Sequence, residues 1–215
     1  DCLIGGTHCP VLLPAVIAAM NPRPQATYVD GTFGGGGYSR RLLESAKCKV
    51  WGVDRDPDAC RRGTSIAQDF GGRLSMIHGC FGDMDHLLTS NHVSKVDGVM
   101  LDLGVSSFQI DDPDRGFSFR FDGPLDMRMS LDGPTVADLV NRKEQTELAN
   151  IIYKYGEERY SRRIARSIIE ARSHGPILRT LELAKIIRGC YPPAKLGLKS
   201  IDPATRTFQL SLIHI

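Results

Sequence analysis

Several features that mark specialised classes of protein are missing from this 215-residue sequence. The six cysteines are dispersed, with no C-x-x-C pair and no histidine at ligand spacing. Reduced thiols in a cytosolic protein are therefore expected, and no metal site is predicted. No apolar run is long enough to span a bilayer, and the N-terminus lacks the basic and then apolar pattern of a signal peptide, so no membrane association is predicted. The chain begins with Asp1 rather than Met, so the sequence does not decide whether a leader precedes it.

The charge balance is too small to identify a function. A net charge of +2 does not by itself indicate a nucleic-acid-binding protein, so such a prediction must come from local clustering of basic residues. With 41% hydrophobic and 24% charged residues, the chain can bury a substantial core. Its length suits one α/β domain with room for a smaller appendage.

The most informative stretch runs from Tyr28 to Ser39 and contains four consecutive glycines. A buried strand is predicted to end at Asp30, and a helix is predicted to begin near Ser39. A strand that passes through glycines into a helix leaves backbone N–H groups unshielded and lets a ligand approach the main chain. Gly34 and Gly36 match the dinucleotide-binding fingerprint, but its last position holds Ser39. The spacing from Asp30 is closer to the acid-led loop of class I S-adenosylmethionine (SAM) methyltransferases, and a glycine turn without a ligand is the alternative.

A second strand, residues 49–54, is predicted to end at Asp54, 20 positions after Gly34. Rossmann-like folds place the acceptor for the ribose hydroxyls at about this distance. The alternative is that Asp54 caps the following helix. Asp56 and Pro57 already have the residue types of an N-cap and a first helical position, so ribose binding is the favoured role for Asp54.

Two more strands are predicted to end at the same edge of the sheet. Residues 73–78 form one, and the loop after it carries Phe81, which could lie against an adenine or pack in the core. Residues 96–102 give the strongest strand signal, because they are apolar on both faces as a central parallel strand should be, and they end at Asp102. Four strand ends then meet in one crevice, where open α/β sheets bind their ligands.

The chain changes character after Gln109. Residues 111–129 are rich in glycine, proline, phenylalanine and arginine and are predicted to form a long functional loop. Helices alone are predicted beyond it, chiefly over residues 145–155, 157–173 and 180–190. Four arginines recur at helical spacing on one face of the second of these helices, which is either a solvated surface or a track for phosphates. They are Arg159, Arg162, Arg163 and Arg166.

Eight segments of the chain resemble, in the same order, those of the bacterial 16S ribosomal RNA N4-cytosine methyltransferases, the RsmH or MraW family, which also has a mitochondrial branch. The segments are HCPVLL (8–13), DGTFGGGGYS (30–39), DRDP (54–57), DLGVSS (102–107), RGFSF (115–119), DGPLDMRM (122–129), YGEE (155–158) and PATRTFQ (203–209). Together they extend over almost the whole chain, so they are far more specific than the glycine loop alone.

This resemblance implies a Rossmann-like class I SAM-dependent methyltransferase sheet with an inserted helical subdomain. Residues 1–129 would belong to the SAM-binding domain, residues 130–203 to the helical subdomain, and residues 204–215 to the return into the methyltransferase domain. Family members continue after this point into a helix and further strands, whereas residues 210–215 depart from the pattern. The sheet is therefore expected to be incomplete and the chain truncated.

The resemblance also implies a function. SAM would be the methyl donor, and the partner would be small-subunit ribosomal RNA of the 16S type or the assembling small subunit, in the cytoplasm or, for a eukaryotic homologue, in the mitochondrion. The implied SAM contacts are Gly36, Gly37, Tyr38, Asp54, Phe81, Asp102 and Gln109. The family usually has histidine where Tyr38 stands, so the resemblance implies the backbone contact there and leaves a side-chain role open.

Methyl transfer to the N4 amine of cytosine requires chiefly that the protein hold the amine in line with the methyl carbon. Asp102 is a candidate to orient the amine and receive its proton, unless the cofactor engages it. The base must leave its stack, and Arg115, Phe117 and Phe119 are candidates to hold it, with a hydrophobic anchor for the loop as the alternative. Further candidate RNA contacts are Arg159, Arg163 and Arg166.

Two rival functions follow from the same features. A Rossmann-type NAD-dependent oxidoreductase would need the complete glycine fingerprint and a proton donor such as a Tyr/Lys or His/Asp set, and neither is found. An RNA-binding fragment without catalysis is supported by the arginine face and by the missing C-terminal strands.

Overall fold

The computed structural model of the chain describes residues 10–192 and 202–208. Two compact units divide the chain, residues 1–106 and residues 107–215. His8 and Cys9 of the first matching segment lie outside the described residues, as do residues 209–215, on which the predicted truncation rests.

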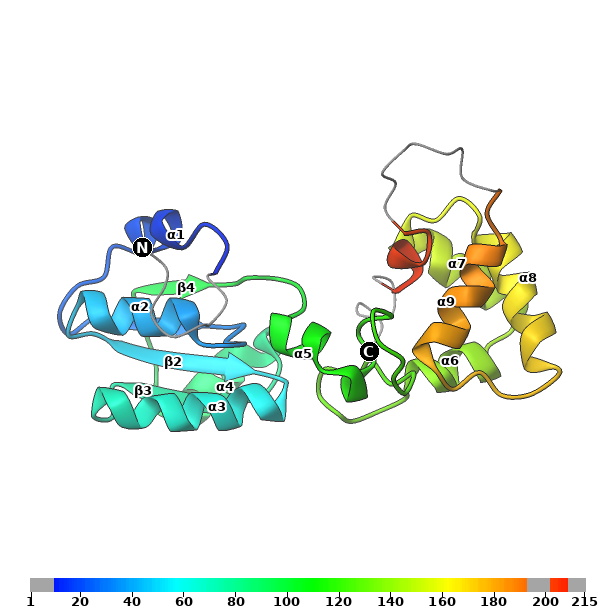
Figure 1. Ribbon diagram of the computed structural model, residues 1–215. Helices are drawn as coiled ribbons and strands as arrows, with labels where there is room; N and C mark the ends of the chain where they lie inside the picture. Colours follow the sequence, from blue (N-terminus) through cyan, green and yellow to red (C-terminus); the bar gives the residue numbers. More distant parts are fainter. Residues whose placement is uncertain (1–9, 193–201, 209–215) are drawn as a thin grey trace. The chain divides into compact units, whose positions relative to one another are not determined.

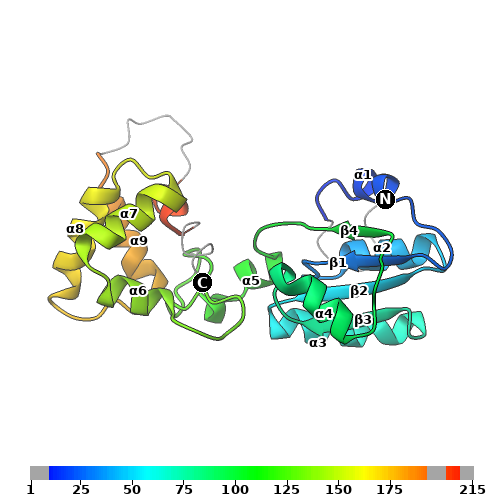
Figure 2. The same cartoon turned by 180° about the vertical axis from the view of Figure 1, so that it is seen from behind.

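The first unit contains a parallel sheet of four strands in the order β3-β2-β1-β4. Their bounds are Thr27–Asp30 (β1), Lys49–Asp54 (β2), Leu74–His78 (β3) and Gly98–Met100 (β4). Val29 of β1 lies opposite Trp51 of β2 on one side and Val99 of β4 on the other, and Figure 2 shows β1 and β4 side by side. Parallel strands joined through helices confirm the predicted Rossmann-like α/β fold.

Helices cover both faces of this sheet (Figure 1). Their bounds are Leu13–Met20 (α1), Gly37–Ser45 (α2), Pro57–Ala67 (α3) and Met84–Ser90 (α4), with 3₁₀ turns at Gln68–Phe70 (η1) and Phe81–Asp83 (η2). Tyr28 packs in the cluster that includes side chains of α1, α2 and α3, whereas Val29 packs in the cluster that includes side chains of α4. Consecutive strand residues point to opposite faces, so one helix layer lies on each side.

The start of α3 follows the predicted capping pattern. Asp56 is the N-cap and accepts a hydrogen bond from the Asp58 N–H at 2.9 Å, and Pro57 occupies the first helical position. The strand predicted over residues 96–102 is different. Within the described residues β4 is short and lies at an edge, and Val99 is 41% exposed. The apolar run therefore did not fix the bounds of the strand.

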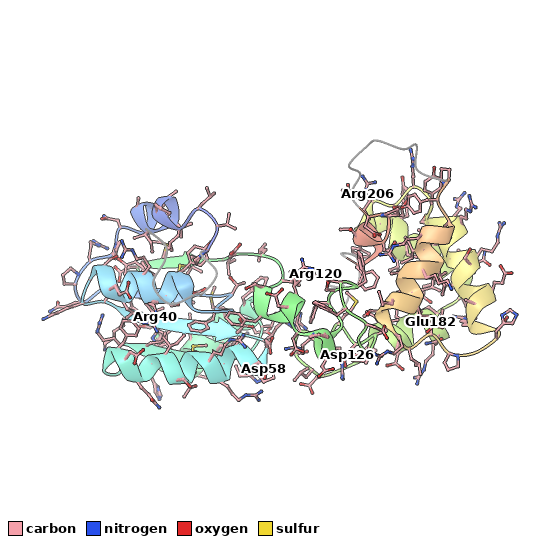
Figure 3. All side chains as sticks on the ribbon, viewed as in Figure 1. Arg40, Asp58, Arg120, Asp126, Glu182 and Arg206 are labelled. Carbon is pink, nitrogen blue, oxygen red and sulfur yellow. The ribbon has the colours of Figure 1, made fainter. Side chains whose placement is uncertain are left out.

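The second unit is helical. Its elements are Ser107–Asp111 (α5), Pro113–Arg115 (η3), Val136–Arg142 (α6), Gln145–Gly156 (α7), Ser161–Arg172 (α8) and Thr180–Gly189 (α9), and residues 204–208 are also helical. The long loop predicted over residues 111–129 is anchored to this unit, since the Leu125 N–H donates to the Leu178 carbonyl and the Thr180 N–H donates to the Gly123 carbonyl. In the same loop Asp126, labelled in Figure 3, forms an ion pair with Arg128.

The helix predicted over residues 157–173 begins later than expected. Glu157 ends α7 in the left-handed region with φ of 49°, and α8 starts at Ser161. Glu158 is 1% exposed and accepts hydrogen bonds from the Tyr160 N–H and the Tyr191 hydroxyl. The two acids therefore form a structured break between the helices and do not lie in the first turn of α8.

Candidate functional site

The glycine loop joins β1 to α2 and needs glycine for two physical reasons. Gly34 and Gly36 have φ of 53° and 75°, a region that L side chains rarely adopt. A Cβ on Gly36 would lie 2.5 Å from Cζ of Phe33, and one on Gly37 would lie 2.4 Å from Cγ of Pro10. Side chains at these positions would displace the residues that pack on the loop.

Some of the loop's N–H groups are already engaged. The Gly34 N–H donates to Oδ2 of Asp54 at 2.7 Å, and the Gly36 N–H donates to the Phe33 carbonyl at 2.7 Å. The expectation of an unshielded loop therefore needs correction at these two positions. The first turn of α2 begins at Gly37, and helix geometry leaves its N–H groups without partners inside the helix.

Asp54 stands at the end of β2 and holds two backbone segments together. Its Oδ2 accepts from Gly34 and its Oδ1 accepts from the Asp56 N–H at 2.9 Å. Burial is the main reason why the pKa of Asp54 is raised. Asp56 caps α3, as predicted, and Asp54 accepts hydrogen bonds from two backbone N–H groups in addition. Because each carboxylate oxygen can accept more than one hydrogen bond, Asp54 retains capacity for a ribose hydroxyl.

Asp102 lies just beyond β4 and is joined to the glycine loop from two sides. Its N–H donates to Oγ1 of Thr32 at 2.7 Å, and the Tyr38 hydroxyl lies 3.3 Å from its Oδ2. The Asp102 side chain belongs to an exposed residue. Thr32 was not predicted as a site residue, because a threonine beside glycines carries no signal that it will bond a strand end 70 positions away.

Asp30 and Ser39 form a buried pair beneath the loop. The Ser39 hydroxyl donates to Oδ2 of Asp30 at 2.7 Å, and Asp30 is 1% exposed. Burial, the largest cause, raises the pKa of Asp30 from 3.8 to about 6; the Ser39 hydrogen bond opposes it, and the charges of Asp54 and Asp102 add to it. Ser39, which broke the dinucleotide fingerprint, thus fixes the start of α2 to the end of β1.

This buried carboxylate predicts a measurable pH dependence. A raised pKa means that the folded state holds the proton more tightly, so stability is lost as pH rises from about 4 through about 6. In urea unfolding, wild type should lose up to about 3 kcal/mol relative to Asp30→Asn between pH 4 and pH 7. Comparing the two proteins removes the contribution of other groups. Parallel pH profiles would show that Asp30 titrates normally.

Phe81 lies in η2, directly after β3 and beside the end of β1. A Cβ on Gly31 would be 3.4 Å from Cβ of Phe81. The residue is 38% exposed. This exposure does not support the alternative that the ring packs in the core, and the adenine contact stays a prediction.

Three predicted site residues belong to the second unit and are buried. Gln109 of α5 is 6% exposed. Arg115 is 9% exposed and donates to the carbonyls of Arg128 and Met129, while its guanidinium lies over the ring of Phe117. Phe117 is itself buried. Both residues hold the loop in this structure, which is the anchor role left open by the sequence, and an RNA contact by either one stays a prediction.

Phe119 shows the same anchoring role. Its ring meets that of Phe208 edge to face, with centroids 4.8 Å apart, and the guanidinium of Arg188 lies 5.2 Å from its centre. The hydrophobic anchor left open by the sequence is therefore the arrangement that the structure favours for Phe117 and Phe119.

The arginine face of α8 is exposed. Ile164, Ala165 and Ile168 are buried on the opposite side of the helix. The exposed residues are Arg159, Arg162, Arg163 and Arg166. Arg159 precedes the helix, with its guanidinium 4.7 Å from the centre of the Tyr160 ring. Within residues 10–192 and 202–208, no ion pair involves any of these four side chains.

Metal-binding clusters and membrane-spanning helices are both absent from the described part of the chain. Within it, no group of three or more His, Cys, Asp or Glu side chains is placed to hold a metal ion. Of its helices, none combines the length and the apolar character needed to cross a membrane.

Comparison with known proteins gives consistent matches. The model of the MraW methylase family matches residues 6–215. The ribosomal RNA small subunit methyltransferase H of Paramagnetospirillum magneticum is 58% identical over 208 residues, which are 97% of this chain and 64% of that protein. Proteins with the same name from Rhodospirillum centenum and Granulibacter bethesdensis are each 56% identical, over 97% and 98% of this chain and 62% of their own length.

The chain thus spans a little under two thirds of the length of these relatives. The family match, by contrast, extends from the segment before α1 to the last residue. The chain belongs to the MraW methylase family.

Proposed function

We propose that this protein transfers a methyl group from SAM to the N4 amine of a cytidine in small-subunit ribosomal RNA. Support comes from the family, from relatives named ribosomal RNA small subunit methyltransferases, and from a sheet edge that carries the loop expected for SAM. Because the relatives are bacterial, the proposed setting is the bacterial cytoplasm, with the 16S-type RNA or the assembling small subunit as partner.

The observation that carries the proposal is the acidity of the crevice. Asp30, Asp54 and Asp102 are close enough for the charges of the latter two to raise the pKa of the first. Arg62 places a positive charge nearby, because its guanidinium lies 3.4 Å from the Gly34 carbonyl oxygen. A site with more acidic than basic side chains favours the sulfonium and ammonium cations of SAM. Ser39 stands where the dinucleotide fingerprint has its last glycine, which disfavours a pyrophosphate cradle and with it the oxidoreductase.

Different residues of the crevice would contact different parts of SAM. The first turn of α2, including Gly37 and Tyr38, offers N–H groups, and Gly36 keeps the approach open. Asp54 would accept from the ribose hydroxyls, and Phe81 would lie against the adenine. Gln109 stays a proposed contact from the second unit. When bound, SAM supplies an electrophilic methyl group on its sulfonium.

Asp102 is the proposed acceptor for the target amine. The lone pair of that amine is conjugated into the ring, so a carboxylate at the base edge would orient the N–H bonds and receive the proton. Asp102 has the exposure this role needs, and its backbone is fixed by Thr32. Positioning of this kind is the main contribution a protein makes to an in-line displacement.

The helical part of the chain is the proposed RNA-binding region. We propose that residues 130–203 form an inserted subdomain, with residues 1–129 before it and residues 204–215 returning to the methyltransferase domain. Arg159, Arg163 and Arg166 would contact phosphates, for which an exposed row of arginines without ion pairs among the described residues is well suited.

Calorimetric titration of the 215-residue chain tests the proposal. SAM and S-adenosylhomocysteine should bind with a stoichiometry of one, and NAD should bind at least about 100-fold more weakly, because the loop lacks the last glycine of the dinucleotide fingerprint. Selective binding of NAD would overturn the methyltransferase assignment.

The arginine face favours a second candidate, an RNA-binding module without catalysis. In that case RNA would bind to the chain, and neither SAM, S-adenosylhomocysteine nor NAD would bind. The same titration, followed by an RNA binding assay, therefore distinguishes the two functions.

A further inference from the structure

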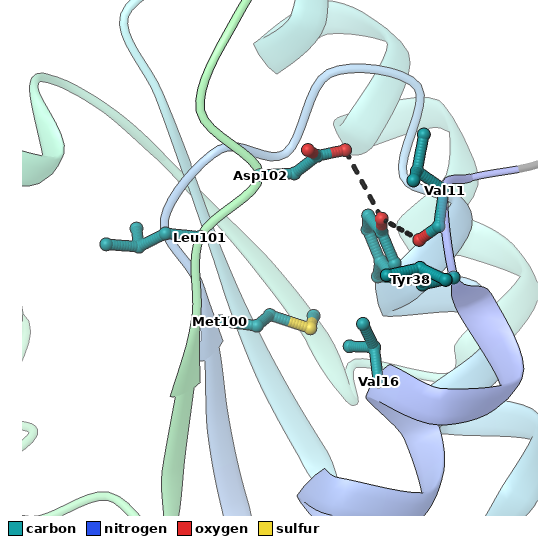
Figure 4. A pocket seen from close by; sticks show the side chains of 7 residues that line it. Val11, Val16, Tyr38, Met100, Leu101 and Asp102 are labelled. Atoms are coloured by element: carbon teal, nitrogen blue, oxygen red, sulfur yellow. Dashed lines mark hydrogen bonds between the residues drawn. The ribbon is translucent and has the colours of Figure 1, made fainter.

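Tyr38 stands at the first turn of α2, where three parts of the first unit meet. Its ring is 8% exposed and lines a cavity of about 200 Å³. Figure 4 shows its hydroxyl between the carbonyl of Val11, which precedes α1, and the carboxylate of Asp102, which follows β4. The other lining residues are Leu12, Val16, Met100 and Leu101.

The Tyr38 hydroxyl has one proton and two acceptors. It lies 2.6 Å from the Val11 carbonyl and 3.3 Å from Oδ2 of Asp102. Burial, followed by the charge of Asp102, raises the pKa of Tyr38 to about 12, so the proton stays on the hydroxyl in neutral solution. A hydroxyl donates one strong hydrogen bond at a time, so the two acceptors compete for it.

Residues 10–12, here called the strap, are held to the loop with little burial. The Pro10 ring fills the space beside Gly37, but the side chains of Val11 and Leu12 are 63% and 71% exposed. Leu12 also adopts φ of 52°, a left-handed conformation that costs a non-glycine residue about 1 kcal/mol. The hydrogen bond from the Tyr38 hydroxyl to the Val11 carbonyl is one of the contacts that hold the strap in place.

We propose that Tyr38 is a positioning residue. Its hydroxyl couples docking of the strap to whether the Asp102 carboxylate is free to accept a hydrogen bond from another donor. While the hydroxyl is bonded to Val11, the Asp102 carboxylate is available to another donor. When the strap leaves, the hydroxyl turns to Asp102 and occupies it. The link to the target amine rests on the proposed function, but the competition between the two acceptors does not.

Coupling of this kind is reciprocal. A ligand that donates to Asp102 releases the hydroxyl to Val11 and so tightens the strap. The strap in turn closes one wall of the cavity in which Asp102 lies. A histidine at this position would titrate near neutral pH, whereas tyrosine keeps the coupling independent of pH in this range.

Amide hydrogen exchange without any ligand tests the competition. The Leu13 and Val16 N–H groups donate to the carbonyls of Pro10 and Leu12, so they report opening of the strap. Tyr38→Phe should speed their exchange about five- to tenfold, as expected for loss of one hydrogen bond. Asp102→Ala should slow it severalfold, because the competing acceptor is gone, and should have no effect in the Tyr38→Phe background.

Two internal controls distinguish the coupling from general destabilisation. The Asn21 N–H at the far end of α1 and the Gly31 N–H, which donates to Met100 in the sheet, should exchange at wild-type rates. Additive effects of Tyr38→Phe and Asp102→Ala would overturn the proposal, as would unchanged exchange at Leu13 and Val16 in Tyr38→Phe.

A second variant covers the case in which Tyr38→Phe does not fold. Tyr38→His should make strap opening depend on pH near about 6.5, because a protonated imidazole would pair with the Asp102 carboxylate. After correction for intrinsic exchange, wild type should show no such step. A flat profile in Tyr38→His would count against the coupling.

Saturating SAM gives a separate measurement. It should protect Leu13 and Val16 severalfold in wild type and not in Tyr38→Phe. Equal protection in both proteins would show that the ligand holds the strap without Tyr38 and would overturn the link to the site. Failure of SAM to bind would instead contradict the proposed function, and the ligand-free comparison would still decide the coupling.

Discussion

Asp54→Ala is expected to lower the affinity for SAM by about 100-fold or more, and calorimetric titration should detect no binding at ordinary concentrations. The substitution removes two contributions at once. It removes the proposed acceptor of the ribose hydroxyls, and it releases the Gly34 N–H, which donates to Oδ2 of Asp54 at 2.7 Å. A freed glycine loop must be ordered again when the ligand binds, so the loss exceeds that of one ligand contact.

A matched pair of ligands separates these two contributions. Removal of the ribose hydroxyls from S-adenosylhomocysteine should weaken binding to wild type and make no difference to Asp54→Ala. Asp56→Ala is the control for the neighbouring cap: it should cost about 1 kcal/mol of stability and leave SAM affinity within about twofold. Wild-type affinity in Asp54→Ala would contradict both roles of this carboxylate.

Local patterns were sufficient to predict the sheet edge that carries the site. Asp56 and Pro57 have strong positional preferences at the start of a helix, and α3 begins there as expected. The glycine loop was located because its conformation admits few other residues, as the φ of Gly36 shows. The bounds of β4 were not predictable in the same way. The apolar pattern runs over residues 96–102, whereas the strand covers Gly98–Met100, because an apolar run does not determine where strand pairing starts and stops.

Residues that act through distant partners were the ones missed. Thr32 and Ser39 are polar residues in a glycine-rich stretch, and only the fold brings them to Asp102 and Asp30. Burial was also unpredictable in the loop of residues 111–129. Arg115 lies in a segment that looks suited to RNA, but its guanidinium donates to two carbonyls of the same loop. Arginine is as suitable for holding backbone oxygens as for binding phosphates, and composition does not separate the two.

The second large effect is expected at the exposed arginines of α8 and of the residues just before it. Replacing Arg159, Arg163 and Arg166 together with glutamate should weaken binding to an oligonucleotide of small-subunit ribosomal RNA by about 100-fold or more at low salt. Among the described residues no acid is paired with these side chains, so their charge is available to a ligand. The slope of log affinity against log salt should fall by about 2, since each contact to a single strand contributes about 0.7.

The RNA effect must also be local to the arginine face. Arg163→Glu alone should weaken RNA binding and leave SAM affinity unchanged, because the two surfaces are built from different units. Lys185→Glu is its matched control, since Lys185 is exposed on α9 and the change in charge is the same. If long-range charge alone drew RNA to this part of the chain, both variants would lose affinity equally. A larger loss in Arg163→Glu therefore requires contacts on the arginine face, and equal loss of SAM would contradict separate surfaces.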